Sequence, residues 1–133
     1  MDNYHQGSCL CGEVRFKVEG EFEHFYLCHC TYCRKDTGSA HGANLFSSKA
    51  SVNWLSGQDN VRTYNLPQTR HTRCFCNICG SALPNVTNNM VIVPAGSLDS
   101  DPAIAPSGHI FIASRAQWDR NLASVPSFDT FPA

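Results

Sequence analysis

The stretch CHCTYC, residues 28 to 33, places three cysteines and one histidine in a single short turn. Zinc takes four protein ligands in a structural site, whereas a catalytic site has three and keeps the fourth position for water or substrate. Cys28, Cys30 and Cys33 alone would form the open kind of site. Cys74 or His29 could supply a fourth ligand and close it, although alternation along the chain turns His29 away from its neighbours. The spacing leaves both alternatives open.

The other five cysteines form two groups, Cys9 with Cys11 and Cys74 with Cys76 and Cys79. The chain starts without the basic and then apolar segments of a signal peptide, so we expect a cytoplasmic protein. Clustered thiols in the cytosol are metal ligands or catalysts more often than disulfides. The spacing and the expected compartment together predict zinc.

Four of these cysteines can form one closed site. Residues i and i+2 of a strand face the same way, so Cys9 and Cys11 can bind one ion from the same side of the chain. Cys76 and Cys79 have the spacing of a zinc knuckle, and Gly80 can adopt the positive φ that such a turn often needs. We therefore predict a structural zinc bound by these four thiolates, and two zinc ions per chain in total.

The composition indicates one small domain without a charged partner surface. The 133 residues suit a single core, and we expect residues 1–133 to form one domain. Ten basic and eleven acidic residues, with no basic run, argue against a nucleic-acid partner. No apolar stretch approaches the ~18 residues that span a bilayer, so we expect no membrane partner. The oligomeric state does not follow from the sequence.

Alternation of apolar and polar residues is the dominant local pattern. In EVRFKVEG, residues 13 to 20, Val14, Phe16 and Val18 share one face, as in a half-buried strand. Similar short apolar runs predict strands over residues 24–29, 42–46, 51–55, 61–66, 70–76, 90–96 and 109–114. We expect a mostly β domain of short antiparallel strands, including strands over Glu13–Val18 and Met90–Val93.

Helical periodicity is nearly absent from the chain. We expect one turn of helix after Cys33, in RKDTG, and another over residues 115–120, RAQWDR. The C-terminal tail, residues 125–133, contains two phenylalanines, and we expect it to pack on the body of the domain.

Four segments of the chain carry a recognisable pattern: SCLCGEVRF (8–16), CHCTYCRKDTGSA (28–40), FCNICGSAL (75–83) and HIFIASRAQWD (109–119). In this order and spacing they resemble the glutathione-dependent formaldehyde-activating enzyme family, which also contains centromere protein V. The resemblance covers the chain from about Gly7 to Trp118. One C-x-x-C pair would be weak evidence, but the ordered set is highly specific.

The resemblance implies a β-rich fold of the tent-like zinc-binding class and a division of labour between two zinc ions. The family's structural zinc ligands correspond to Cys9, Cys11, Cys76 and Cys79. Its catalytic zinc ligands correspond to Cys28, Cys30 and Cys33. The family's named activity joins formaldehyde to glutathione to give S-hydroxymethylglutathione and is classed as that of a carbon–sulfur lyase. The implied partner is therefore a small glutathione-like thiol.

Zinc at an open three-thiolate site favours the thiolate form of a bound thiol. Three anionic ligands weaken the Lewis acidity of the ion, so we expect thiol capture and positioning rather than strong activation of a carbonyl. Arg34, next to Cys33, is a candidate contact for a carboxylate of the thiol. Cys74 lies outside the family pattern, and no residue is an obvious general acid or base, although histidines stand at positions 24, 29, 41, 71 and 109.

Other functions compete with the enzyme. A non-catalytic zinc-stabilised interaction domain would be favoured by a fourth protein ligand on the three-cysteine group and by a flat apolar surface patch. A redox or metal-storage protein would use the same thiols after losing zinc. An enzyme instead requires a solvent-reachable cavity at Cys28, Cys30 and Cys33.

Overall fold

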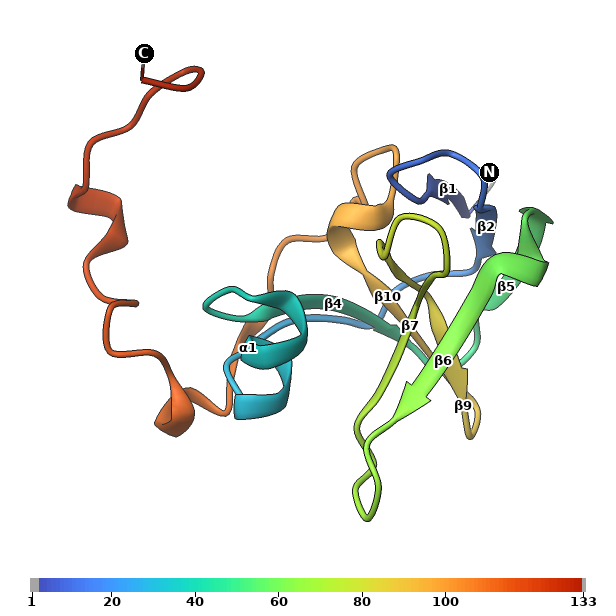
Figure 1. Cartoon of the computed structure of the whole chain (residues 1–133), viewed down its shortest axis with the longest axis horizontal. Helices are drawn as coiled ribbons and strands as arrows, with labels where there is room; N and C mark the ends of the chain where they lie inside the picture. The colour runs from blue at the N-terminus through green and yellow to red at the C-terminus, as the bar shows by residue number, and fades with distance from the viewer. Residues whose placement is uncertain (1–2, 133) are drawn as a thin grey trace.

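Three small β-sheets and one short α-helix make up the computed structural model, which describes residues 3–132 (Figure 1). The first sheet has the order β1 (Tyr4–Ser8), β2 (Arg15–Glu19), β5 (Ser51–Ser56). The second has the order β11 (Gly108–Ile110), β3 (His24–Cys28), β4 (Gly42–Ser47), β10 (Met90–Pro94), β9 (Asn85–Thr87). The third has the order β6 (Val61–Asn65), β7 (Thr72–Cys76), β8 (Ala82–Leu83). The strands pair antiparallel except for β11, which pairs parallel to β3. This confirms the mostly β single domain.

The helix α1 (Thr31–Thr37) follows β3 directly, and four short 3-10 helices lie in the connections and the C-terminal segment. They are η1 (Gln58–Asn60), η2 (Ala95–Ser97), η3 (Ile112–Ser114) and η4 (Leu122–Ser124). No helix within residues 3–132 is long and apolar enough to cross a membrane.

The predicted alternation of β2 builds the core. Phe16 and Val18 are fully buried, and Phe16 packs its ring edge-on against Trp54 of β5, with 6.0 Å between the ring centroids. The ladder with β1 begins at Arg15, two residues after the predicted start. Val14 is also fully buried, but its N–H donates to Cys9 Sγ and its carbonyl accepts from Cys9 N. The backbone of Val14 thus supports the first cysteine loop rather than the sheet.

The second sheet has two different faces. Leu45 of β4 and Val93 of β10 are fully buried and belong to the core cluster. Their neighbours along the strands, Asn44, Phe46 and Ile92, line a cavity instead. Since successive side chains of a strand point to opposite faces, the same two strands carry the core on one side and the cavity on the other.

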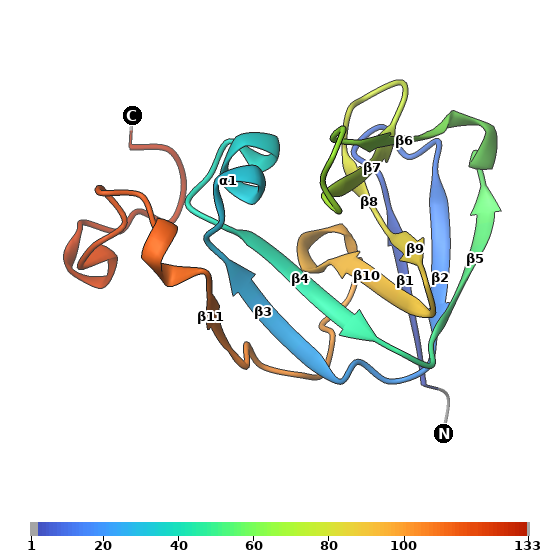
Figure 2. The same cartoon turned by 90° about the horizontal axis from the view of Figure 1, so that it is seen from below.

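The helix begins earlier than expected. Cys30 is the N-cap residue, and its sulfur accepts a hydrogen bond from Cys33 N at 3.3 Å. A side chain that satisfies an orphan N–H in the first turn favours helix initiation there. Gly38 ends the helix in the left-handed conformation. The metal-binding stretch is therefore also the start of α1, which lies at the end of the β3–β4 pair (Figure 2).

Two expectations for the C-terminal part are wrong. Residues 115–120 form no helix; η3 lies just before them, and Arg115, at φ −59° and ψ 151°, leaves the helical conformation at the start of the segment. The tail does not pack on the body, since the exposed fractions of Phe128 and Phe131 are 62% and 85%. The segment leaves the sheets beyond β11 (Figure 1), and Pro126 gives it no N–H with which to join a strand ladder.

Candidate metal centres and the adjoining cavity

The two cysteines between β1 and β2 meet the two cysteines at the end of β7 and in the loop after it. The Sγ atoms of Cys9, Cys11, Cys76 and Cys79 all lie within 4.8 Å of one another. Cys9 and Cys11 are 3.5 Å apart at Sγ, and Cys11 and Cys76 are 3.9 Å apart. Tetrahedral zinc, with Zn–S bonds of about 2.3 Å, separates its sulfurs by about 3.8 Å. This four-cysteine group therefore fits one metal ion.

A tight turn over Cys76–Cys79 brings two of the four sulfurs together. Ile78 N donates to Cys76 Sγ at 3.4 Å, and Gly80 N donates to Cys76 O at 2.8 Å, which closes a tight turn at the end of β7. Gly80 has φ 78°, as the sequence predicted. Glycine adopts this conformation without the steric cost that a Cβ imposes.

The four-cysteine group ties distant parts of the fold together. Cys9 and Cys11 lie in the loop between β1 and β2, whereas Cys76 and Cys79 bracket the loop between β7 and β8 of another sheet. Ser81 supports the junction, because its hydroxyl accepts from Leu10 N at 2.8 Å. The backbone and the side chain of Ser81 also lower the pKa of Cys79 to about 5. That thiol is thus a thiolate at neutral pH, the form that binds metal.

Cys28, Cys30 and Cys33, the three-cysteine group, come from one short piece of chain: the end of β3, the N-cap and the first turn of α1. Their Sγ atoms also lie within 4.8 Å of one another. No histidine, carboxylate or further cysteine of residues 3–132 joins them. The group could hold a metal ion through three protein ligands.

His29, one of the two proposed fourth ligands, points to other partners. It is 1% exposed, with Nε2 2.8 Å from His109 Nδ1 of β11. Its Nδ1 lies 3.2 Å from Asp119 Oδ2, without the angle of a hydrogen bond. Burial lowers the pKa of His29, despite the nearby Asp119 carboxylate. The imidazole therefore links the cysteine turn to the C-terminal segment.

Cys74, the other proposed fourth ligand, is buried on β7 and belongs to neither group. Its sulfur lies 3.3 Å from Thr63 Oγ1 and 3.7 Å from Asn85 Oδ1. Cys74 nevertheless lines the same cavity as the three-cysteine group.

The thiols of the three-cysteine group resist carrying three negative charges together. Burial, followed by the neighbouring thiols of Cys30 and Cys28, raises the pKa of Cys33. Burial also raises the pKa of Cys28. Burial would raise the pKa of Cys30 as well, but hydrogen bonds to its sulfur outweigh burial and lower the pKa. The strongest of these hydrogen bonds comes from Cys33 N. A bound divalent cation would compensate the charge and displace the protons, as metal–thiolate sites require.

A cavity of about 580 Å³ opens beside the three-cysteine group. Its apolar wall consists of Ala43, Phe46, Ala82, Leu83, Ile92, Pro94, Ile110 and Phe111. Its polar lining includes Tyr32, Asp36, Thr37, Asn44, Arg70, His71, Thr72, Arg73, Asn85 and Thr87. Gly42 of β4 lies beside the metal ligands, and a Cβ there would be in van der Waals contact with Cys33, at 3.4 Å from its Cβ and 3.6 Å from its Sγ. The cavity satisfies the requirement for an enzyme.

Two arginines line the cavity, and neither is the one the sequence suggested. Arg34 Nη1 donates to Ser114 O at 3.0 Å, and Arg34 is not among the lining residues. Arg73 is engaged, with Nη1 3.7 Å from Asp36 Oδ1 and Nη2 donating to Gly80 O at 3.2 Å. Arg70 is exposed and has no ion pair within residues 3–132.

Sequence reasoning did not connect Asp36 with this site, although a signal was present. Asp36 follows Cys33 by three residues on the expected helical turn, and residues at this spacing lie on one face of a helix. Arg70 and Arg73 had no such signal, because their segment reaches the cavity only through the packing of the third sheet.

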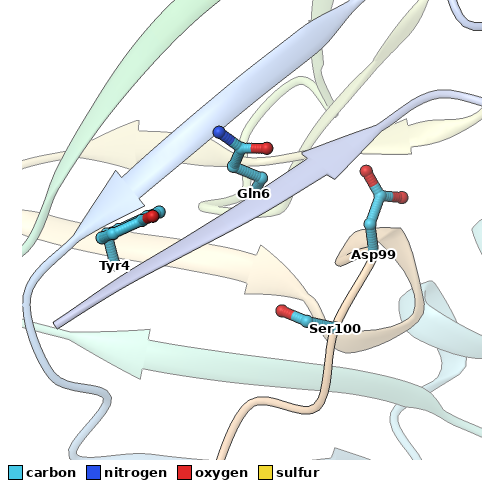
Figure 3. Close-up of a pocket in the computed structure, with 4 residues that line it drawn as sticks. All are labelled: Tyr4, Gln6, Asp99 and Ser100. Atoms are coloured by element: carbon cyan, nitrogen blue, oxygen red, sulfur yellow. The ribbon is translucent and has the colours of Figure 1, made fainter. Parts of the chain in front are cut away.

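A second hollow, of about 560 Å³, lies between β1 and the loop that follows η2 (Figure 3). Tyr4 and Gln6 line it from the strand, and Asp99 and Ser100 from the loop. The Asp99 carboxylate accepts a hydrogen bond from Ser8 Oγ at 2.9 Å. None of these four residues is a cysteine or a histidine, so the hollow offers no thiolate or imidazole chemistry.

The fold and the two cysteine groups define a class of protein: a small β domain with two candidate thiolate metal centres, one closed and one beside a cavity. The model of the family "Glutathione-dependent formaldehyde-activating enzyme" matches residues 4–114. The chain belongs to this family.

One relative agrees with this assignment, and one solved structure shares the fold. A protein of Halomonas elongata named "Putative glutathione-dependent formaldehyde-activating enzyme" is 30% identical over an alignment of 145 positions, which covers 91% of this chain and 88% of that protein. The crystal structure of a Rhodobacter sphaeroides protein is similar with a TM-score of 0.55 and 23% identity, over 78% of this chain and 98% of the other. The second likeness concerns the fold alone.

Proposed function

We propose that this protein is a zinc-dependent enzyme of the carbon–sulfur lyase type that acts on a glutathione-like thiol adduct. The reaction is the formation of S-hydroxymethylglutathione from formaldehyde and glutathione, or a closely related one. The observation that carries the proposal is a group of three cysteine sulfurs, without a fourth protein ligand among residues 3–132, at the wall of a cavity. Family membership supports the same substrate class.

In this proposal Cys9, Cys11, Cys76 and Cys79 hold a structural zinc, and Cys28, Cys30 and Cys33 hold the catalytic zinc. The catalytic zinc would supply a cation that favours the thiolate form of the substrate's sulfur. The cavity, at about 580 Å³, is within the size range of small-molecule sites. Its apolar wall, including Phe46 and Ile92, excludes water from one side of the reacting sulfur.

Glutathione carries two carboxylates, and two arginines are candidates to bind them. Arg34 remains a proposed contact, because its helix carries Cys33, but its guanidinium would have to leave Ser114 O. Arg70 already lines the cavity, and its charge has no acidic partner within residues 3–132. Arg34→Gln and Arg70→Gln, compared by calorimetry, rank the two: the larger loss of glutathione affinity identifies the contact.

The test of the function is isothermal titration of the zinc-loaded protein with glutathione, together with exchange NMR of glutathione and formaldehyde. We expect saturable binding at millimolar concentration or below and faster adduct exchange than in buffer. Cys30→Ser is the control and should lose both. If the wild-type protein, carrying two zinc ions, shows neither binding nor faster exchange, the proposed function is wrong.

One observation favours the second candidate, a non-catalytic interaction domain. The C-terminal segment exposes several large apolar side chains, among them Trp118 at 61%, Phe128 at 62% and Phe131 at 85%. Exposed apolar clusters often mark protein contacts. In that case Phe128→Ser with Phe131→Ser should abolish a self-association or partner binding seen by analytical ultracentrifugation, and zinc content should not change.

A further inference from the structure

His71 and Asp36 meet across the cavity that contains the three-cysteine group. His71 directly precedes β7, and Asp36 lies on α1, three residues beyond Cys33. His71 Nε2 is 2.5 Å from Asp36 Oδ2, and the side chains are 19% and 24% exposed. Both residues line the cavity together with the cysteine sulfurs. The imidazole is thus partly shielded from water but open to a ligand in the cavity.

Asp36 is itself held in place. Arg73 of β7 donates to the Asp36 carbonyl and approaches its Oδ1 at 3.7 Å. The Tyr32 ring packs on the imidazole, with 5.3 Å between the ring centroids. The imidazole is therefore held by two residues of α1, at its Nε2 by Asp36 and on its ring by Tyr32. In its neutral form, a histidine whose Nε2–H points to a carboxylate leaves Nδ1 as a proton acceptor. Nδ1 makes no hydrogen bond within the part of the chain that the structure describes.

We propose that His71, oriented by Asp36, is the proton-transfer residue of this site; the inference rests on the proposed function. When a thiol adds to an aldehyde, an S–C bond forms and the C=O π bond breaks. The thiol loses its proton and the former carbonyl oxygen gains one, so no net proton is consumed. His71 accepts the proton from sulfur and returns it to oxygen, and it performs the two steps in reverse order when the adduct breaks down. General acid–base groups of this kind contribute roughly 10²–10⁴-fold to a rate.

The competing role for this pair is a purely structural link between α1 and β7. Two controls separate the roles. Arg73→Gln weakens the same junction and keeps the imidazole. His24→Gln removes an exposed imidazole that stacks on Tyr26 and does not line the cavity. A structural role predicts that His71→Gln and Arg73→Gln act alike, through stability, and that the pH profile keeps its shape. Among residues 3–132, the titratable groups in contact with the His71 ring are Asp36 and Tyr32 of α1, and the charge nearest to this pair is Arg73 of β7, which contacts Asp36.

The experiment uses the full chain loaded with zinc and measures glutathione–formaldehyde exchange by NMR between pH 5.5 and 8.5. We expect His71→Gln to lower the exchange rate about 10²-fold or more and to remove one limb of the pH profile, with zinc content and glutathione affinity unchanged. Asp36→Asn should cause a smaller loss and shift that limb, and His24→Gln should match the wild type. The imidazole signals of His71 should move when glutathione binds, which is a readout independent of turnover.

The outcomes separate the two proposals. If the wild type neither binds glutathione nor accelerates exchange, the proposed function fails, and the role of His71 fails with it. If the wild type is active but His71→Gln keeps its rate and pH profile, or the His71 signals do not respond to glutathione, only the role of His71 is overturned. A loss that Arg73→Gln reproduces in full, in parallel with lower stability, also overturns it in favour of the structural link.

Discussion

The two cysteine groups are built from the same residue type and differ in how far apart their members lie in the chain. The four-cysteine group joins loops of two sheets, with Cys11 and Cys76 separated by 65 positions. The three-cysteine group spans six consecutive residues at the β3–α1 junction. A metal ion held by distant segments stabilises the fold, because the unfolded chain has no such site. A metal ion whose ligands all lie in one short turn can be released without separating distant parts of the fold.

We therefore expect sequence separation, and not ligand type, to decide which of the two centres is coupled to folding. The four-cysteine group contains a complete set of ligands from distant loops. The three-cysteine group has only local ligands and faces a cavity.

Replacing one cysteine in each group should give the largest difference in stability between two variants. Cys11→Ser should lose one zinc and most of the stability of the domain, because apparent binding free energies of structural zinc are on the order of 10 kcal/mol. Cys30→Ser should lose the other zinc and keep the β signal. Elemental analysis combined with thermal unfolding checks both. Similar losses of stability in the two variants would contradict the division.

Two glycine substitutions should divide in the same way, with smaller effects. Gly80→Ala places a side chain at φ 78° beside Cys79 and should lower the free energy of unfolding by roughly 1–2 kcal/mol. Gly42→Ala places a Cβ in van der Waals contact with Cys33, so a small effect should fall on the zinc affinity of the three-cysteine group, with less effect on unfolding. Gly96→Ala is the control, since Gly96 has neither positive φ nor an atom that its Cβ would meet. Denaturant titration and zinc affinity give the two readouts. Equal unfolding effects of Gly80→Ala and Gly96→Ala would refute the prediction.

The pH at which each zinc leaves should differ as well. Each group contains thiols whose pKa is shifted in either direction. In the four-cysteine group Ser81 lowers the pKa of Cys79 to about 5. A backbone hydrogen bond at Glu13 acts in the same direction on Cys11, but burial and the neighbouring thiols outweigh it and raise the pKa of Cys11 to about 12. In the three-cysteine group burial raises the pKa values of Cys28 and Cys33, and hydrogen bonds lower that of Cys30. Protons compete with metal for thiolates. The three-cysteine group has one thiolate fewer to hold its ion, so on acidification it should release zinc first. The stability that the Cys79 thiolate contributes is fully present above its ordinary pKa of 9.0 and is lost as the pH falls through about 5.

Ser81→Ala tests this assignment. Removing the Ser81 hydroxyl should shift the release of zinc from the four-cysteine group to slightly higher pH. The pH at which the three-cysteine group releases its zinc should not change. A chromogenic zinc indicator followed during a pH titration measures both steps. Release of the two ions in the opposite order would contradict the prediction that the group with fewer thiolates loses its ion first.

Cys74→Ser should have the smallest effect on metal. Cys74 belongs to neither group, so zinc content should stay near two per chain, whereas Cys76→Ser should lose one ion and stability. Elemental analysis decides between them. Equal zinc loss in the two variants would make Cys74 a ligand.

The sequence predicted the strands and both cysteine groups because their signals are local. Alternation found β2 and β10, C-x-C and C-x-x-C spacing found the thiols, and the turn chemistry of Gly80 was correct. Three strands, β1, β8 and β9, escaped because they are short or weakly apolar. Gly7 explains why β1 has a weak pattern. A Cβ at this position would lie 2.2 Å from the Phe16 ring, so packing requires glycine, and glycine contributes no side chain to an apolar–polar alternation.

Features that depend on tertiary packing could not be predicted from the sequence. The cavity unites residues of α1, β4, β10 and the third sheet, and only their assembly shows that His71 and Asp36 meet there. For the C-terminal tail, the apolar residues in the sequence predicted packing that the structure does not contain. Val125 and Phe128 look like core residues, but no surface of the described fold covers them, and they are 53% and 62% exposed. Apolar content predicts burial only where a partner surface exists.

The most direct measurement is chelation of the zinc-loaded protein, with released zinc and far-UV circular dichroism recorded together. Our account predicts that a mild chelator removes one zinc quickly while the β signal stays intact, because a chelator can enter the open position of the three-cysteine group. Any binding of glutathione should disappear at this first step. The second zinc should leave only as the domain unfolds. Loss of both ions in one unfolding event would contradict the account, since the three-cysteine group would then be structural.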